Sequence, residues 1–254
     1  MEEIKIQSSY YDGLKLPQFF MFFTIIYTIS HKVFKNWNPK LKYEACSCFL
    51  SLFHGTPSVI LAVSAIFLNN NTENPEKTSV FAAENTDFQN IVLEFSTGYF
   101  LMDLLHYFVF KPDDVLFIAH HLATLFTLLT CRFLVNHGAF AILVILVIAE
   151  VTSACQNVWS LARLRKNDLG IAAKVYNFLV PEFYAFYTVA RGVFVPLFVL
   201  KMGLVYTSGA VDNVIPTWVW CSWMMLTVSG IFASLLWILS HWIVFFKERM
   251  SKQH

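Results

Sequence analysis

The chain has 254 residues, of which 57% are hydrophobic and only 14% are charged, and its mean hydropathy is +0.56. Soluble domains are roughly 45–50% apolar and about 25% charged, so a soluble globule is excluded. The 26 Phe, 7 Trp and 10 Tyr residues likewise exclude intrinsic disorder. The net charge of +1 offers no basic excess for a nucleic-acid backbone, so we expect no nucleic-acid partner. The composition indicates an integral membrane protein.

Seven segments approach the roughly 20 apolar residues that a helix needs to cross a bilayer. In chain order they are residues 16–34, 45–68, 91–110, 115–134, 138–160, 176–199 and 216–246. We therefore predict an all-α membrane protein with about seven transmembrane helices in one bundle. The chain divides into residues 1–41 (tail, first helix and basic loop), 42–247 (a six-helix membrane domain) and 248–254 (a short cytosolic tail).

Lysine and arginine concentrate in the loops on one side of these helices. Twelve fall on that side and five on the other. The twelve are Lys32, Lys35, Lys40, Lys42, Lys111, Arg163, Arg165, Lys166, Lys174, Lys247, Arg249 and Lys252. Because cytoplasmic loops carry the excess of Lys and Arg, we expect a lumenal N-terminus and a cytosolic C-terminus. The long polar loop 69–90 is then lumenal, and its sequon Asn70-Asn71-Thr72 makes Asn70 a candidate glycosylation site.

Ionisable residues inside a bilayer cost about 2.5–3.5 kcal/mol each at a helix centre, so each is a candidate for function. Those in the predicted spans are Glu94, Asp103, His106, His120, His121, Glu150, Glu182, Arg191 and His241. At a rise of about 1.5 Å per residue, most of them lie at one depth in the cytosolic half, whereas Arg191 falls in the lumenal half. This depth pattern predicts a polar chamber that opens toward the cytosol.

Helical spacing sorts these candidates further. Ser96, Tyr99, Asp103 and His106 share one face of the third helix, Thr124 shares a face with the two adjacent histidines, and Glu150, Ser153 and Asn157 form a polar stripe on the fifth helix. Interhelical hydrogen bonding alone would explain Glu94, Arg191 and His241. Two adjacent imidazoles in an apolar span are costly for packing alone, which favours a functional role for His120 and His121 together with Asp103.

The tract from Gly98 through Asp103 to His106, followed by Ile118-Ala119-His120-His121-Leu122-Ala123-Thr124, resembles the TLC family, named for TRAM, Lag1 and CLN8 proteins. The resemblance runs from about Lys42 to Lys247 and is strongest to small plant TLC-domain proteins. Ceramide synthases of this family transfer a fatty acyl group from acyl-CoA to a sphingoid amine and require their adjacent histidines. The resemblance therefore implies catalytic roles for His120 and His121 with Asp103 in support, acyl-CoA as a co-substrate, and no resident cofactor.

One departure from the ceramide synthases concerns residues 149–157, which read Ala-Glu-Val-Thr-Ser-Ala-Cys-Gln-Asn and lack the His-Asp pair of their second motif. This favours the non-synthase branch and leaves catalysis open. A neutral imidazole can still remove a proton from an amine or accept an acyl group, and a buried carboxylate would fix its tautomer. The candidate substrate-binding residues are His106, Thr124, Glu150, Asn157 and Glu182.

The leading hypothesis is a multi-pass membrane protein that binds or processes a membrane lipid, with acyl transfer to a lipid amine through the histidine pair as its specific form. The alternative is a non-catalytic factor in membrane lipid composition or trafficking, as the CLN8 and TRAM branches imply. The family resemblance also implies an endoplasmic reticulum location, and the sequence leaves assembly into homo-oligomers open.

Two further classes fit less well. A metal-dependent lipid oxidase or desaturase would use His106, His120, His121 and Asp103 as ligands, but such enzymes need clustered histidine repeats and the eight histidines here are scattered. We therefore assign no metal ligand. A seven-helix receptor would share the helix count and orientation, but the sixth and seventh helices lack receptor signatures.

Overall fold

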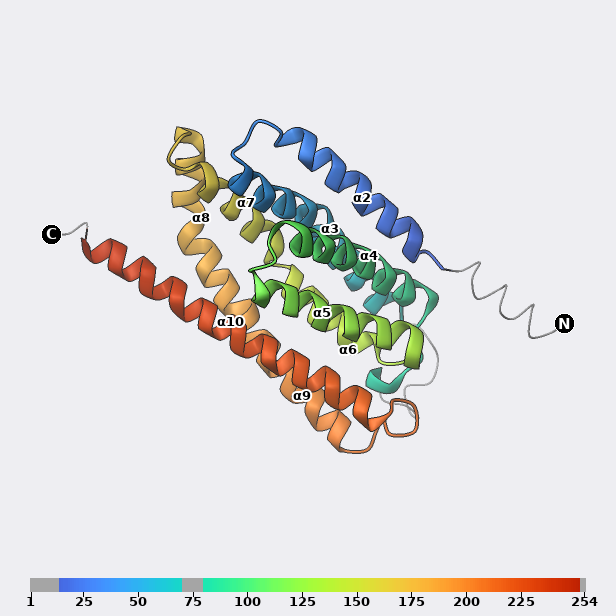
Figure 1. Cartoon of the computed structure of the whole chain (residues 1–254). Coiled ribbons are helices and arrows are strands. Elements are labelled where there is room, and N and C mark those ends of the chain that lie inside the picture. The colour runs from blue at the N-terminus through green and yellow to red at the C-terminus, as the bar shows by residue number, and fades with distance from the viewer. Residues whose placement is uncertain (1–13, 70–79, 252–254) are drawn as a thin grey trace.

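The computed structural model describes residues 14–69 and 80–251, and within them the chain is helical apart from turns and one isolated bridge between Glu84 and His137. Figure 1 shows the helices packed side by side, with α10 lying across the others. The elements are α2 (Leu16–Val33), α3 (Pro39–Asn69), η1 (Val80–Ala82), α4 (Asp87–Phe110), α5 (Val115–Leu129), η2 (Thr130–Val135), α6 (Ala139–Glu150), α7 (Ser153–Arg165), α8 (Gly170–Val189), η3 (Ala190–Phe194), α9 (Val195–Thr207) and α10 (Thr217–Ser251).

The predicted all-α membrane bundle is confirmed, and the described residues form seven helical segments, because α5 leads into η2, α6 into α7, and α8 through η3 into α9. Five of these segments are long and apolar enough to cross a membrane by length and composition. They are Pro39–Leu68, Val115–Val135, Ala139–Arg165, Gly170–Thr207 and Thr217–Lys247. The other two predicted spans, α2 and α4, do not meet those criteria within the described residues.

Helix α4 lies at the centre of the bundle, in contact with α2, α3, α5 and α6. Its buried side chains include Gln89, Glu94, Asp103 and His106. Polar side chains are tolerated in a membrane helix where they face protein and find partners instead of facing lipid. The central position of α4 therefore explains both its low hydropathy and its concentration of ionisable residues.

Helix α2 packs closely along α4. A Cβ atom placed on Gly98 would lie 3.0 Å from the backbone of Phe19, so only glycine allows this approach without a shift. The ring of Phe95 lies 5.4 Å from that of Phe19 and 5.1 Å from that of Phe23. Gly98, which begins the family-like tract, thus sets the distance between the first helix and the centre of the bundle.

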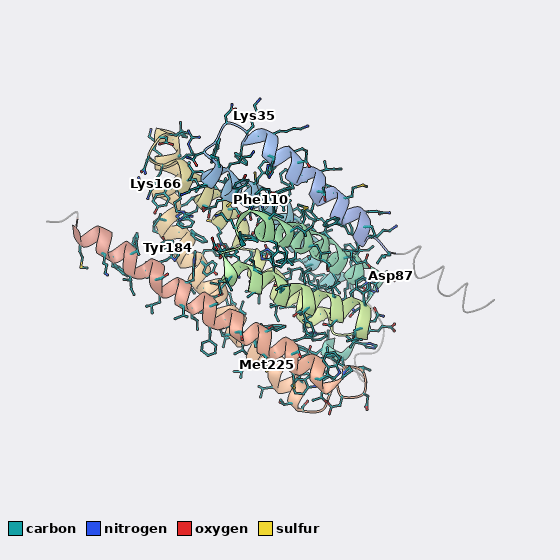
Figure 2. The ribbon with its side chains drawn as sticks, viewed as in Figure 1. Lys35, Asp87, Phe110, Lys166, Tyr184 and Met225 are labelled. Atoms are coloured by element: carbon teal, nitrogen blue, oxygen red, sulfur yellow. The ribbon has the colours of Figure 1, made fainter. Side chains whose placement is uncertain are left out.

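The basic loops meet at one end of the bundle. Glu44 at the start of α3 pairs with Lys111, which follows α4, over 3.6 Å, and also with Arg163 near the end of α7. Figure 2 shows Lys35 and Lys166 at this same end, while Asp87 lies at the other. The basic loops therefore lie together at one end of the bundle, as the sequence predicts.

Two short π-helical segments, η2 and η3, interrupt the long helices. The second lies directly before Pro196, whose ring would clash with the carbonyl of Gly192 in a regular α-helix and which has no N–H to donate to it. The wider π turn removes that conflict, so α8 and α9 continue as one helical segment through Pro196. Each π segment also carries an arginine, Arg132 in η2 and Arg191 in η3.

Candidate functional site

Asp103 and His121 form a hydrogen-bonded pair between α4 and α5. The Nε2 atom of His121 lies 3.0 Å from Oδ2 of Asp103, and the hydroxyl of Tyr99 donates to the same oxygen over 3.4 Å. The other ring nitrogen, Nδ1, lies 2.8 Å from the carbonyl oxygen of Phe117, one helical turn earlier. Asp103 and His121 are both buried, so these contacts hold the imidazole ring in one orientation.

The two contacts of the His121 ring also fix the number of protons on the pair. The carbonyl oxygen of Phe117 only accepts, so Nδ1 must carry a hydrogen. A second hydrogen must lie between Nε2 and the carboxyl group of Asp103, because two bare lone pairs would repel at 3.0 Å. The pair is therefore neutral overall, which avoids an isolated charge inside the bundle. His121 is left without a free lone pair to act as a base.

His120 precedes His121 on α5 but lies in different surroundings. Its side chain is exposed, and its ring nitrogens make no hydrogen bond with any group in residues 14–69 and 80–251. The ring packs edge-on against Phe100 and His121, at centroid distances of 6.1 and 5.6 Å. Successive helical residues point about 100° apart, so one imidazole enters the core while the other does not. His120 is the member of the pair that remains available to a ligand.

His54 of α3 joins this cluster and was not among the candidates drawn from the sequence. Its Nε2 atom lies 3.1 Å from Oγ of Ser96, and its ring stacks on that of Tyr99. Its Nδ1 atom is buried without a hydrogen-bond partner among the described residues and lies 3.8 Å from Oε2 of Glu150. The missed signal was available, because His54 is an ionisable residue within the second predicted span.

Glu150 reaches the cluster from the end of α6. A Cβ atom on Gly55 would lie only 3.2 Å from Oε2 of Glu150 and 2.7 Å from Oγ of Ser153, so glycine at this position leaves space for both polar groups. The helix breaks directly after Glu150, at Val151 and Thr152. Broken helices are tolerated within membranes where protein or a polar cavity surrounds them.

Asn157 lies one helical turn beyond Ser153, where it connects α7 to α3. Its side-chain nitrogen donates to Oγ of Ser51 and to the carbonyl of Ser153, both over 2.8 Å. The polar stripe predicted on the fifth span therefore faces α3, where Asn157 makes interhelical hydrogen bonds.

The remaining candidate binding residues lie apart from one another. His106 is buried and its Nδ1 atom lies 2.7 Å from the hydroxyl of Tyr27, whereas Thr124 donates to the carbonyl of His120 within its own helix. Glu182 is exposed on α8 and makes no hydrogen bond or ion pair within the described part of the chain. Although the sequence places Glu182 and Asp103 at a similar depth in the membrane, Glu182 therefore does not join the polar cluster around Asp103. Asn70 lies outside the described residues.

Of the three residues that interhelical bonding alone would explain, Glu94 has such surroundings. Glu94 accepts hydrogen bonds from the backbone N–H of Lys15 and Leu16 and from Nε of Arg132. The Nδ1 atom of His241 lies 2.9 Å from the carbonyl oxygen of Trp237 in its own helix, and its ring packs edge-on against that of Tyr184 on α8 at a centroid distance of 5.1 Å. Arg191 donates to the carbonyl oxygen of Ala149 over 2.6 Å, so it lies beside the end of α6 and near the cluster instead of at a separate lumenal level.

Metal and thiol chemistry can be assessed over the described residues. Within them, no group of three or more His, Cys, Asp and Glu side chains is arranged to hold a metal ion. The five cysteines are free, as the sequence predicts, and Cys46, Cys48 and Cys131 are buried.

Comparison with known proteins places this geometry in a family. The TLC domain profile matches residues 44–245. A TLC domain-containing protein of Arabidopsis thaliana is 52% identical over 241 residues, covering 94% of this chain and 92% of the relative. No solved structure matches. The resemblance inferred from the tract around Asp103 and the histidine pair is confirmed, and the chain belongs to the TLC domain family of membrane proteins.

Proposed function

We propose that this protein binds a membrane lipid beside His120 and that His120 serves as the reactive imidazole in acyl transfer to a lipid amine. One observation carries the proposal: both ring nitrogens of His121 are engaged by Asp103 and Phe117, whereas those of His120 are engaged by nothing in the described part of the chain. The exposed imidazole of His120 lies within a membrane-spanning segment and has no hydrogen bond in the described part of the chain to account for its cost. A ligand that hydrogen-bonds to His120 would account for it.

The chemistry needs one proton acceptor and no oxidant. The amine nitrogen attacks the carbonyl carbon of the acyl thioester of acyl-CoA, the C–N bond forms, and the C–S bond breaks. The proton lost by the amine passes to a ring nitrogen of His120 and then to the departing thiolate, so the products are an amide and a thiol. General-base assistance of this kind contributes about 10²–10⁴-fold in rate.

Asp103 and His121 act as positioning residues in this proposal. Their neutral pair lies directly beside His120, whose ring centroid is 5.6 Å from that of His121. Two hydrogen bonds hold the His121 ring in place. Because the His120 ring packs against it, His121 restricts the orientation of His120. Glu150 and His54, whose Oε2 and Nδ1 atoms lie 3.8 Å apart, add polar groups to this cluster from α6 and α3.

The location proposed with this function is the endoplasmic reticulum membrane, with the N-terminus in the lumen and the C-terminus in the cytosol. The clustering of Lys111 and Arg163 around Glu44 at one end of the bundle supports this orientation, because basic loops favour the cytosolic side. Since α5 starts at this end and His120 is its sixth residue, the site lies within reach of acyl-CoA in the cytosol.

The test uses the full chain purified and reconstituted in lipid vesicles with a long-chain acyl-CoA and a sphingoid amine. Mass spectrometry first identifies lipids that copurify and then measures the amide formed. We expect amide formation by the unaltered protein and at least a 100-fold loss in His120→Ala. His137→Ala is the matched control, because it removes an imidazole at the other end of the bundle, where Nδ1 bonds the carbonyl of Val135.

A non-catalytic lipid-binding or trafficking role is the second candidate. It is favoured by the fact that Asn157 and Thr124 use their donors within the bundle, which leaves few donors for a developing oxyanion. Under this alternative, lipid still copurifies but neither the unaltered protein nor His120→Ala forms amide. Amide formation that survives in His120→Ala would eliminate the imidazole mechanism.

A further inference from the structure

A small groove lies between α8 and the C-terminal half of α10. Its volume is about 140 Å³, and most of its lining is aromatic: Tyr184 and Tyr187 of α8, and Trp237, His241 and Trp242 of α10. None of the residues that line it carries a fixed charge. Ligand sites of this kind are mostly apolar, with a few placed polar groups that set the orientation of the ligand. A neutral ligand therefore fits the groove.

His241 provides a hydrogen-bond acceptor in this groove. Its Nδ1 atom lies 2.9 Å from the carbonyl oxygen of Trp237 and 3.3 Å from the hydroxyl of Ser240, which itself donates to that carbonyl. Both neighbours of Nδ1 can therefore accept, so Nδ1 carries the hydrogen of the neutral ring and Nε2 carries the lone pair. Within residues 14–69 and 80–251, Nε2 makes no hydrogen bond.

Trp159 of α7 adds a hydrogen-bond donor to the same aromatic cluster. Its Nε1 atom is buried and has no hydrogen-bond partner among the described residues, although buried donors in native proteins nearly always have one. The indole of Trp242 shows the usual arrangement, since it donates to Oγ1 of Thr188 over 3.0 Å. The Trp159 ring lies 5.8 Å from that of His241, centroid to centroid.

One hydroxyl group would satisfy both nitrogens. A hydroxyl accepts one hydrogen bond and donates another, and two such bonds through one oxygen span at most about 5.7 Å. This span is comparable with the 5.8 Å between the rings of Trp159 and His241. Aromatic rings also collect where a membrane meets water, but that tendency alone does not account for a buried N–H without a partner beside an imidazole nitrogen without one.

Two cations border the groove without lining it. Arg163 lies over the Trp159 ring, 5.3 Å from its centroid, and pairs with Glu44. Arg191 lies over the Tyr187 ring, 5.2 Å from its centroid, and donates to the end of α6. The lining itself therefore offers rings and hydrogen-bonding nitrogens, which suits an alcohol better than an anion.

We propose that this groove binds the hydroxyl-bearing end of a membrane sterol, which donates to Nε2 of His241 and accepts from Nε1 of Trp159. A sterol carries one hydroxyl group on a rigid, flat and uncharged body, and a rigid body loses little conformational freedom on binding. The rest of the sterol lies along the outer surface, where Phe186 on α8 is 42% exposed and Leu239 on α10 is 58% exposed. His241 is six residues before Lys247, the end of the span, so the hydroxyl lies about 9 Å of helix from that end.

The test measures equilibrium binding to the full chain in phosphatidylcholine nanodiscs by native mass spectrometry. The probes are cholestanol, its ketone cholestanone, which accepts but cannot donate, and dioleoylglycerol, a flexible lipid alcohol. We expect cholestanol to bind at least tenfold more tightly than either of the others. His241→Phe keeps a ring and removes the acceptor, so it should lower the affinity for cholestanol to that for cholestanone.

Trp159→Phe should weaken both sterol probes at least threefold, because the indole N–H donates to a hydroxyl and a ketone alike. Trp218→Phe is the matched control, since it removes an indole from an exposed site at the other end of α10, and it should change neither affinity. Should His241→Phe fail to fold, His241→Gln keeps an acceptor and should keep the preference for cholestanol, while Trp159→Phe still tests the donor.

Three results would overturn the inference. Equal affinity for cholestanol and cholestanone would exclude recognition of the hydroxyl, and equal affinity for dioleoylglycerol would exclude selection of the flat body. Unchanged binding of cholestanol by His241→Phe would place the sterol elsewhere. The inference does not depend on acyl transfer: a protein that binds cholestanol but forms no amide would contradict only the proposed function, and the reverse result would contradict only the sterol site.

Discussion

His54 lies face to face on Tyr99, with ring centroids 4.0 Å apart and planes 6° apart. The stack joins α3 to α4 directly beside the Asp103–His121 pair, because the hydroxyl of Tyr99 donates to Asp103. His54 therefore influences the site through Tyr99 as well as through its approach to Glu150. This contact connects the packing of the core to the polar cluster.

We predict that His54→Ala destabilises the protein by about 3 kcal/mol, because it empties a fully buried ring position. His54→Phe keeps the stack on Tyr99 and should cost less, although Ser96 loses its partner. Thermal unfolding of the purified variants in one detergent measures both effects. An equal loss in the two variants would mean that the hydrogen bond, and not the ring stack, provides the stability.

Replacing Asp103 by Asn should impair function while leaving the fold intact. The amide can donate to Nε2 of a neutral His121 whose Nδ1–H still bonds Phe117, so both hydrogen bonds survive without the second proton of the pair. We expect a melting temperature within a few degrees of the unaltered protein and at least a tenfold loss of lipid processing. A large drop in melting temperature would instead indicate that the charge is needed for folding.

Glu94→Gln should behave in the opposite way, with reduced stability and a milder effect on the site. It breaks the ion pair with Arg132, and loss of one partner of a buried pair costs about 3–5 kcal/mol. Glu84→Gln is the control, since Glu84 accepts only an exposed hydrogen bond from Asn136 at the same end of the bundle. The detergent-solubilised yield and the thermal unfolding of the two variants measure the difference in stability. Equal stability of Glu94→Gln and Glu84→Gln would mean that Arg132 binds another partner and that the ion pair is not needed.

The double replacement of His120 and His121 by Ala should abolish activity while the protein still inserts and accumulates. Removal of two imidazoles from a membrane segment makes insertion easier, so loss of function could not be ascribed to failed insertion. Immunoblotting of membranes measures accumulation alongside the lipid assay, and full activity in a well-expressed double variant would contradict a catalytic role.

A tag inserted within residues 73–79 should be protected from protease in intact microsomes, and one placed after His254 should be digested. The physical reason is the excess of basic residues in the loops that share an end with the C-terminal helix. Detergent permeabilisation provides the control, because it should expose both tags. The reverse pattern would place the basic end in the lumen and remove the route proposed for acyl-CoA.

The helices were predictable because each crossing needs a long apolar run, and the central one was recognised despite its polar residues. The meeting of Asp103 with the histidine pair was also expected, yet the sequence could not tell which histidine would bind it. Adjacent residues diverge by about 100°, so the choice between His120 and His121 depends on how α5 is rotated against α4. That rotation is set by packing over the whole bundle.

Depth in the membrane alone does not predict the surroundings of two residues, Glu182 and Arg191. Glu182 has a depth similar to that of Asp103, but its direction around α8 turns it outward, and depth contains no information on direction. Arg191 was assigned to the lumenal half from a span of residues 176–199, whereas the helical segment extends over Gly170–Thr207. The longer segment places Arg191 nearer to its middle. Arg191 also contacts the end of α6, where the helix breaks after Glu150, and no proline or glycine in the sequence there indicates that break.

The first helix lies before residues 44–245, the stretch that matches the family, yet it provides hydrogen-bond partners for buried residues of that stretch. Its backbone N–H groups at Lys15 and Leu16 bond Glu94, and the hydroxyl of Tyr27 bonds His106. A shortened chain that began at residue 44 would expose an acid and an imidazole of α4 to hydrocarbon. Expression of the family stretch alone should therefore yield aggregated protein, and coexpression of residues 1–43 as a separate peptide should restore a soluble complex in detergent.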